Sequence, residues 1–237
     1  MDAWQLILTR EVPGLVNMQT DLRLFNELEA GQIPSTLRLY SWRPNCISLG
    51  YSQKIVEEID VRKAAKLGWD VVQRPTGGGI VFHNEAEVTY SLVTDIDNPK
   101  LPKGLVPAYK KISEAIVCAL KTVGVTAKIA RTQNTEHGTR NTGLCFEYPA
   151  EYEIVSNNQK IVGSAQKRGK KALLQQGSIF VRDTKKELFS VLRNPYNEQM
   201  AVSVEDVLGR EVGFAELSKA LISGFEEGLG VKFKIQK

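Results

Sequence analysis

The sequence is poor in the residues from which disulfide frameworks and metal sites are usually built. Its 237 residues include only three cysteines and two histidines. The cysteines are Cys46, Cys118 and Cys145, which lie far apart without any C-x-x-C pair. An odd count with no metal-ligand spacing argues against both a disulfide framework and a zinc site. We therefore expect no metal and a reducing compartment.

Long apolar runs and concentrated charge are also missing. No apolar run approaches the ~20 residues that a membrane span requires. The first residues, Met-Asp-Ala-Trp-Gln, lack the basic segment of a secretory signal. The net charge is only +4, without the Lys/Arg stripe typical of nucleic-acid binders. We expect a cytoplasmic protein that binds neither membrane nor nucleic acid.

The most basic stretch is Lys167-Arg168-Gly169-Lys170-Lys171. Two interpretations stay open for it. It is either a solvated turn between two strands or a docking site for an acidic partner protein.

Strands and helices are expected to alternate irregularly, with no internal repeat and no low-complexity segment. This pattern predicts a single α+β (mixed α/β) domain over residues 1–237, without an accessory C-terminal domain. Apolar spacing predicts helices over 17–28 and 107–123, after Asp60 and Ser203, and near the end with Phe214, Leu217, Leu221 and Phe225 inward. Strands are expected over 4–8, 36–40, 46–49, 69–72 and 231–235.

Two hairpins are predicted from alternation and turn residues. The first runs from 80–83 through Asn84-Glu85-Ala86 to 87–93. The second runs from 152–155 through Ser156-Asn157-Asn158 to 160–162. The polar stretch 131–143 is predicted to be a loop and is a candidate mobile lid.

Three consecutive glycines, Gly77, Gly78 and Gly79, give the strongest local signal. Such a run costs backbone entropy and usually marks a special turn or a ligand that approaches the backbone. Exposed N–H groups there could bind a carbonyl, carboxylate or phosphate. Arg74 adds a permanent charge before the run and His83 a donor after it. A plain glycine turn is the alternative, whereas the dinucleotide fingerprint is excluded by its spacing.

A lysine followed by small residues gives the second signal. Lys160 precedes Gly163, Ser164 and Ala165, and Gly177 comes shortly after. A long thin ligand could lie against such a wall while Lys160 points at its polar head. An ordinary surface lysine in a strand is the alternative.

Cys145 is the third candidate. A free cysteine is most often a small buried hydrophobic residue. Cys145, however, follows a polar loop, where a neighbouring ammonium could lower its pKa and supply thiolate at neutral pH. Cys46 and Cys118 are expected in a short apolar strand and beside the apolar stripe of a helix, so neither is a candidate.

These segments together resemble one family, the biotin/lipoate protein ligase and octanoyltransferase superfamily. The matching motifs span roughly residues 1 to 200 in the expected order. They are Asn17-Met18, Thr36-Leu-Arg-Leu-Tyr-Ser-Trp42, Ser48-Leu-Gly-Tyr51, Arg74-Pro-Thr-Gly-Gly-Gly-Ile-Val-Phe-His83, Glu87-Val-Thr-Tyr-Ser91, Cys145-Phe146, Tyr152-Glu-Ile-Val155, Lys160-Ile-Val-Gly-Ser-Ala-Gln166 and Gln176-Gly-Ser178.

The match is closest to the cysteine-dependent octanoyltransferases. The resemblance implies the biotin-ligase/lipoate-ligase catalytic-domain fold, a mixed sheet flanked by helices. It implies octanoyl (or lipoyl) transfer from acyl carrier protein, without a cofactor, to a lysine of a lipoyl-domain protein such as the glycine-cleavage H protein or an E2 subunit. Cys145 would be the acyl-thioester nucleophile, and Lys160 would hold the acyl carbonyl. Substrate would be bound by Arg74, Thr76, Gly77, Gly78, Gly79, His83, Gly163, Ser164, Ala165 and Gly177.

One residue departs from the transferase pattern. Gly79 stands where these transferases usually carry arginine, and a triple glycine is frequent in lipoate ligases. A small lipoate–protein ligase that uses ATP and Mg²⁺ to form lipoyl-AMP is therefore the alternative. A non-catalytic module that binds lipoyl domains is a third reading. The sequence names neither the acceptor protein nor the oligomeric state, although a monomer is typical of the family.

Overall fold

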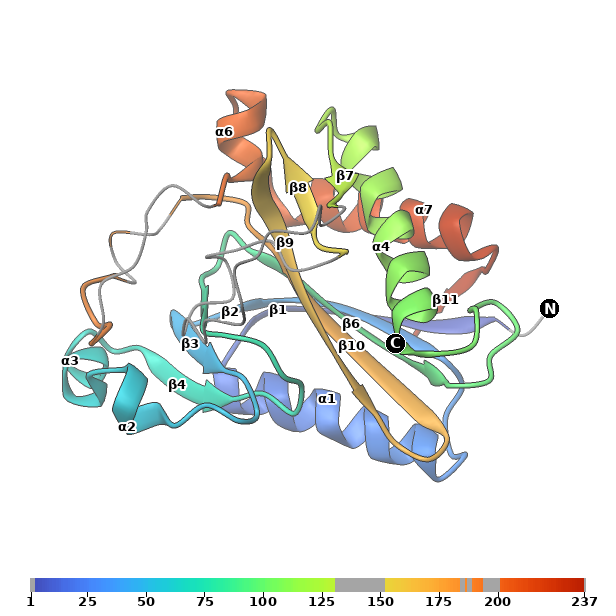
Figure 1. Ribbon diagram of the computed structural model, residues 1–237, viewed down its shortest axis with the longest axis horizontal. Helices are drawn as coiled ribbons and strands as arrows, with labels where there is room; N and C mark the ends of the chain where they lie inside the picture. The colour runs from blue at the N-terminus through green and yellow to red at the C-terminus, as the bar shows by residue number, and fades with distance from the viewer. Residues whose placement is uncertain (1–2, 131–151, 184–185, 187–188, 194–200, 237) are drawn as a thin grey trace, which may run out of the picture.

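The computed structural model describes residues 3–130, 152–183, 186, 189–193 and 201–236. An eight-stranded mixed sheet runs through the molecule (Figure 1). β1 is parallel to β2 and β11, while the remaining neighbours are antiparallel. In spatial order the strands are β11 (Phe233–Ile235), β1 (Trp4–Val12), β2 (Thr36–Trp42), β6 (Val88–Asp95), β10 (Ala172–Ile179), β9 (Gln159–Arg168), β8 (Ile154–Ser156) and β7 (Lys128–Ile129).

Helices cover both faces of this sheet. α1 (Gly14–Glu29) lies on one face, and α4 (Leu105–Thr122) and α7 (Phe214–Leu229) pack together on the other (Figure 1). The predicted helices and the mixed sheet are thereby confirmed, with α4 starting two residues before its predicted start. Because both faces are covered, strand β6 is buried from Val88 to Thr94, including its polar residues Thr89, Ser91 and Thr94.

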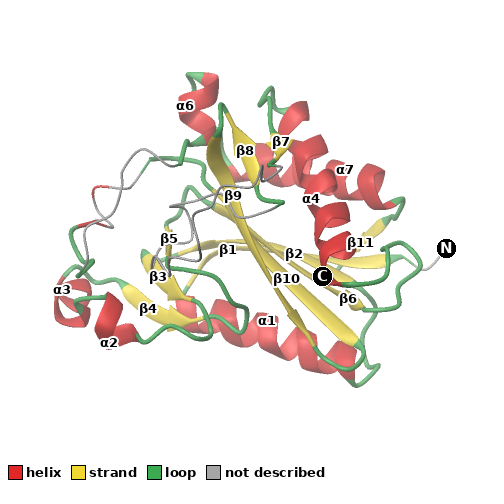
Figure 2. Cartoon of the chain, in the orientation of Figure 1, coloured by secondary structure: helices red, strands yellow, loops and turns green. Residues whose placement is uncertain are grey.

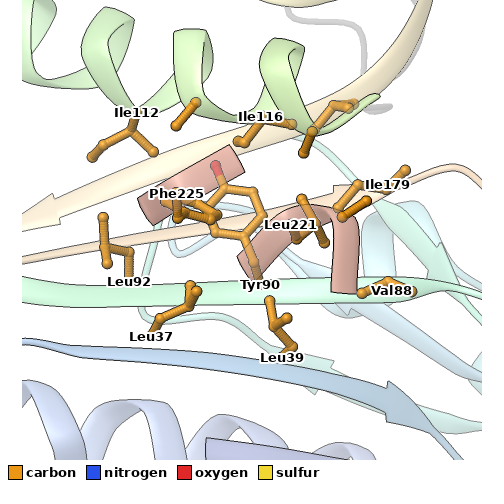
Figure 3. Close-up of a cluster of buried hydrophobic side chains, with 14 of the residues drawn as sticks. Leu37, Leu39, Val88, Tyr90, Leu92, Ile112, Ile116, Ile179, Leu221 and Phe225 are labelled. Atoms are coloured by element: carbon orange, nitrogen blue, oxygen red, sulfur yellow. The ribbon is translucent and has the colours of Figure 1, made fainter. Parts of the chain in front are cut away.

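The main core fills the space between the sheet and the α4–α7 pair. Figure 3 shows Leu37, Leu39 and Tyr90 of the sheet facing Ile116 and Phe225 of the helices. All five side chains are fully buried. The apolar stripe read from the sequence of α4 therefore points into this core.

A second, smaller sheet lies beside the large one (Figure 2). Its strands are β4 (Asp70–Gln73), β3 (Cys46–Leu49) and β5 (Val81–His83), in that order. The glycine triplet lies between two of these strands, β4 and β5. α2 (Ile55–Glu58) and α3 (Val61–Lys66) flank this sheet. Its own apolar cluster contains Ile47, Leu49, Ile59, Ile80 and Phe82. Asp60 caps α3 as predicted, accepting the N–H of Lys63 at 3.1 Å.

The first predicted hairpin is wrong. β5 pairs with β3 in the small sheet, whereas β6 pairs with β2 and β10 in the large one. The side chain of Asn84 accepts the N–H groups of Ala86 and Glu87 at 2.9 and 3.1 Å. This side-chain turn redirects the chain from one sheet to the other instead of closing a two-stranded ladder.

The second predicted hairpin is confirmed. β8 and β9 are antiparallel, with Val155 opposite Lys160. Asn157 and Asn158 both adopt positive φ, 50° and 62°, as a tight hairpin turn requires. The predicted helix after Ser203 is α6 (Val204–Leu208), with a complete capping box between Ser203 and Asp206.

Residues 131–151 lie outside the described part of the chain, and with them the predicted loop and Cys145. Among the described residues, no helix is long and apolar enough to cross a membrane.

Candidate active site

Arg74 holds the glycine loop in place through hydrogen bonds from its guanidinium. Its guanidinium donates to the Ser48 carbonyl and hydroxyl, both at 2.7 Å, and to the carbonyls of Gly77 and Gly79 at 3.1 and 2.7 Å. The side chain is only 7% exposed. The predicted permanent charge is thus present, but it holds the loop as well as facing the pocket.

One position of the loop has a backbone conformation that favours glycine. Gly78 has φ of 90°, a conformation that residues with a Cβ rarely adopt. Gly50, at the end of β3, lies so close that an added Cβ would overlap the Gly78 carbonyl oxygen. The Tyr51 N–H also donates to the Thr76 carbonyl at 2.9 Å. Sequence reasoning did not assign this packing role to Gly50.

A pocket opens beside this loop. Six of the predicted site residues line it: Arg74, His83, Gly163, Ser164, Ala165 and Gly177. Met18 of α1, Tyr40 and Trp42 of β2, and Val81 of β5 supply apolar walls. The pocket therefore lies where the two sheets meet, and it combines apolar walls with a few polar groups, as small-molecule sites commonly do.

A glycine at position 177 on β10 is required by the side chains that pack against it. An added Cβ at Gly177 would overlap the Tyr90 ring and lie 2.5 Å from the Ser164 hydroxyl. The Tyr90 hydroxyl lies 2.7 Å from Ser164 Oγ and accepts from Gln175 Nε2 at 3.0 Å. Burial raises the pKa of Tyr90 to about 12, so it stays protonated and holds this wall in place.

His83 is held on every side. Its ring stacks on Trp42 with centroids 4.0 Å apart. Nε2 lies 2.5 Å from Ser48 Oγ and Nδ1 lies 2.7 Å from Glu87 Oε1. Glu87 Oε1 also accepts from the Thr89 hydroxyl at 2.5 Å. His83 thus has a fixed orientation in the pocket wall, and its carboxylate partner, four residues further along the chain, was not identified from the sequence.

Lys160 is not the surface lysine of the alternative interpretation. Its side chain is fully buried and forms an ion pair with Glu153, which is also buried. Lys160 lies on β9 three residues before Gly163, but it is not among the residues that line the pocket. Sequence reasoning placed Glu153 in a family motif without recognising it as the partner of this lysine.

The remaining predicted residues divide into two groups. Thr76 donates to the side chain of Gln176 at 2.8 Å, and Gly77 to Gly79 form the loop above Arg74. Cys145 lies outside the described residues.

Cys46 is buried, and burial together with nearby Asp70 and Glu87 raises the pKa of its thiol well above the usual range. Within the described ranges, no three His, Cys, Asp or Glu side chains are placed to hold a metal ion.

Similarity to known proteins covers nearly the whole chain. Residues 13–226 match the family model for the lipoyl protein ligase A/B catalytic domain. The octanoyltransferase LipM of Kyrpidia tusciae is 36% identical over 99% of this chain and 90% of its own length. That of Carboxydothermus hydrogenoformans is 37% identical over 98% of this chain and 89% of its own.

Solved structures give the same result for the fold. A lipoate-protein ligase A bound with ATP superposes with a TM-score of 0.80 and 25% identity, covering 99% of this chain and 89% of that one. The bipartite lipoate protein ligase of Thermoplasma acidophilum, studied with its E2 lipoyl domain, superposes with a TM-score of 0.76 and 23% identity, over 100% and 87%. The predicted resemblance and fold class are confirmed, and the chain belongs to the lipoyl protein ligase A/B catalytic domain family.

Proposed function

We propose that this protein is an octanoyltransferase of protein lipoylation. It would move an octanoyl group from acyl carrier protein to a lysine of a lipoyl-domain protein. The observation that carries the proposal is similarity of 36 and 37% over nearly the whole chain to proteins named octanoyltransferase. The pocket agrees with this chemistry, because its apolar walls lie beside polar side chains such as Arg74 and His83. The whole chain is proposed to act as one catalytic domain.

The proposed reaction has two balanced steps. The thiolate of Cys145 attacks the carbonyl carbon of the octanoyl thioester, and the carrier leaves as its thiol after taking up a proton. The amine of the target lysine then attacks the Cys145 thioester. An amide forms, the amine loses its proton, and the Cys145 thiol is restored. No ATP is consumed, because the incoming thioester is already activated.

Lys160 and the glycine loop are proposed to bind the acyl carbonyl. A cation near this carbonyl stabilises the negative charge that develops on its oxygen in both steps. Lys160 can do so only if its ammonium donates to the substrate oxygen while it stays paired with Glu153. The acyl chain would then lie against the pocket wall that Gly163 to Ala165 of β9 and Gly177 of β10 form.

The ATP-dependent ligase is the second candidate, favoured by the superposition on an ATP-bound ligase. The described residues fit a triphosphate poorly. Arg74 donates to two loop carbonyls and to Ser48, and Lys160 is paired with Glu153. Both cations thus contact neutral or negative protein groups rather than a site left open for phosphate.

Acylation of Cys145 separates the two candidates. Octanoyl-carrier protein without ATP should add one octanoyl mass to the protein, and hydroxylamine should remove it because it cleaves thioesters and not amides. Cys145→Ala should abolish both the adduct and transfer to an apo lipoyl domain. Cys46→Ala and Cys118→Ala are the matched controls and should keep both.

The comparison with octanoate or lipoate plus ATP and Mg²⁺ completes the test. If Cys145→Ala is fully active with that mixture and no adduct forms from the carrier, the ligase takes the place of the transferase. Binding of a lipoyl domain with no transfer from either donor would point to a non-catalytic module.

A further inference from the structure

A buried polar chain connects the glycine loop to helix α1 through strand β10. The Thr76 hydroxyl donates to Gln176 Oε1 at 2.8 Å, although the two residues are 100 positions apart in the sequence. Gln176 Nε2 donates to Asp21 Oδ2 at 2.7 Å. Gln176 is 4% exposed and Thr76 is 1% exposed. Neither contact follows from the local sequence pattern.

Asp21 is itself fixed by groups that donate to it. Arg38 Nη1 donates to Oδ1 at 2.8 Å, and the Tyr40 hydroxyl donates to Oδ2 at 2.7 Å. Asp21, Arg38 and Tyr40 are all buried, with at most 1% exposure. Burial and the neighbouring Asp21 raise the pKa of Tyr40 well above its usual range, so Tyr40 remains a donor. This anchor joins α1 to the central strand β2.

The Gln176 amide offers both groups that its two neighbours need. A carboxylate on one side must accept, and a threonine hydroxyl on the other side donates, so residue 176 has to offer a donor and an acceptor at once. Gln176 also lines the pocket with Met18, whose sulfur lies 3.8 Å from Nε2. A displaced Gln176 would therefore change the loop and the pocket wall together.

We infer that Gln176 is a positioning residue that fixes the glycine loop, through Thr76, onto the Asp21–Arg38 ion pair. The inference rests on the proposed function, because the loop is there assigned to the acyl carbonyl. Displacement of about 1 Å in such a group can lower a rate by about a hundredfold. Loss of the Gln176 amide should therefore lower kcat/KM for the acyl donor while the fold persists.

The first experiment measures the loop directly. Hydrogen exchange of the amides of residues 76–80 should be faster in Gln176→Leu and in Thr76→Val than in wild type. The two substitutions remove the same link, so their effects on kcat/KM should not add in the double variant. Full additivity, or wild-type exchange with wild-type kcat/KM in Gln176→Leu, would overturn the inference.

The second experiment uses a pH profile that a merely structural residue would not change. In Gln176→Glu the new carboxyl faces Asp21, so burial and like charge raise its pKa. When protonated, it can donate to Asp21 and accept from Thr76, as the amide does. Its kcat/KM should thus approach wild type at low pH and fall by up to about a hundredfold as pH rises.

Other charged groups do not produce this profile. Arg38 and Tyr40 face Asp21, and Arg74 and His83 line the same pocket, but all four are shared by wild type and variant. A Gln176→Glu profile parallel to that of wild type would refute the positioning role. If wild type lacks carrier-dependent transfer, the proposed function fails, whereas hydrogen exchange in the loop still decides the inference. If Gln176→Leu does not fold, Thr76→Val and Gln176→Glu provide the same two readouts.

Discussion

At the scale of single residues, Lys160 and Glu153 form a buried ion pair, and variants can separate its contribution to activity from its contribution to stability. Lys160→Ala should lower transfer by at least about a hundredfold, because both candidate mechanisms need a cation at the acyl carbonyl. It should also destabilise the fold by about 3–5 kcal/mol, since a buried carboxylate loses the ammonium that faces it. Activity assays and denaturant unfolding measure the two effects. Lys160→Ala/Glu153→Ala should recover stability without activity, whereas near-normal turnover in Lys160→Ala would remove Lys160 from the site.

Gly78 and Gly77 offer a matched pair within the loop. Gly78→Val places a β-branched side chain at φ of 90°, which is strained by more than about 1 kcal/mol and should abolish tight donor binding. At Gly77 an added Cβ meets nothing within 4 Å, so Gly77→Ala should cost less. Donor affinity measured by titration tests the order. A folded Gly78→Val protein with unchanged affinity would favour the plain-turn interpretation.

At the scale of elements, Glu29 ties the end of α1 to the β9–β10 turn. Its carboxylate accepts the N–H groups of Lys170, Lys171 and Ala172 at 2.7 to 3.1 Å. The hydrogen bond from Ala172, followed by those of the two lysines, holds the pKa of Glu29 below its usual 4.5. Lys167 and Arg168 thus end β9, and residues 169–171 form the turn between strands that one interpretation predicted. Docking of an acidic protein at this stretch stays a prediction.

The lowered pKa sets the sign of a pH effect. A carboxyl whose pKa is lower in the folded protein stabilises it above its unfolded pKa, and this contribution is lost as pH falls through the folded value. Glu29→Gln should therefore have a lower melting temperature than wild type near pH 7, and the difference should shrink below pH 4.5. Melting curves at pH 3 and pH 7 measure it. An equal difference at both pH values would contradict the assignment.

At the scale of the whole molecule, the two apolar cores differ in how directly they support the pocket. Ile47 belongs to the core of the small sheet and Leu120 to the core of the large one. Each substitution to alanine should cost about 2–5 kcal/mol. Ile47→Ala should also weaken binding of the acyl donor, because β3 supports the glycine loop through Ser48 and Gly50.

Leu120→Ala is the control, since Leu120 lies about 16 Å along α4 from Tyr109, which contacts the Ser164 carbonyl. Unfolding in urea gives the stabilities, and donor titration at a temperature where both variants are folded gives the affinities. Equal donor affinities in the two variants would show that the pocket does not depend on the small core.

Some features of the protein follow from the sequence alone because they are local. The helix predicted over residues 107–123, the Asp60 cap, and the Asn157-Asn158 turn each depend on neighbours within a few residues. The glycine triplet likewise indicated a special backbone before the φ of Gly78 was known. Family motifs in a fixed order then predicted the fold and six residues of the pocket wall.

Only the tertiary structure decided how distant segments meet. The strand at 81–83 could pair with the next strand by local pattern, yet it joins β3, because strand pairing depends on what the rest of the chain brings alongside. The link from Gln176 to Thr76 joins the large sheet to the glycine loop. Glu153 and Lys160 meet within the β8–β9 hairpin, and Ser48 meets His83 across the paired strands β3 and β5. Local composition identifies which residues can hydrogen-bond, but burial in the folded chain selects which partners they have.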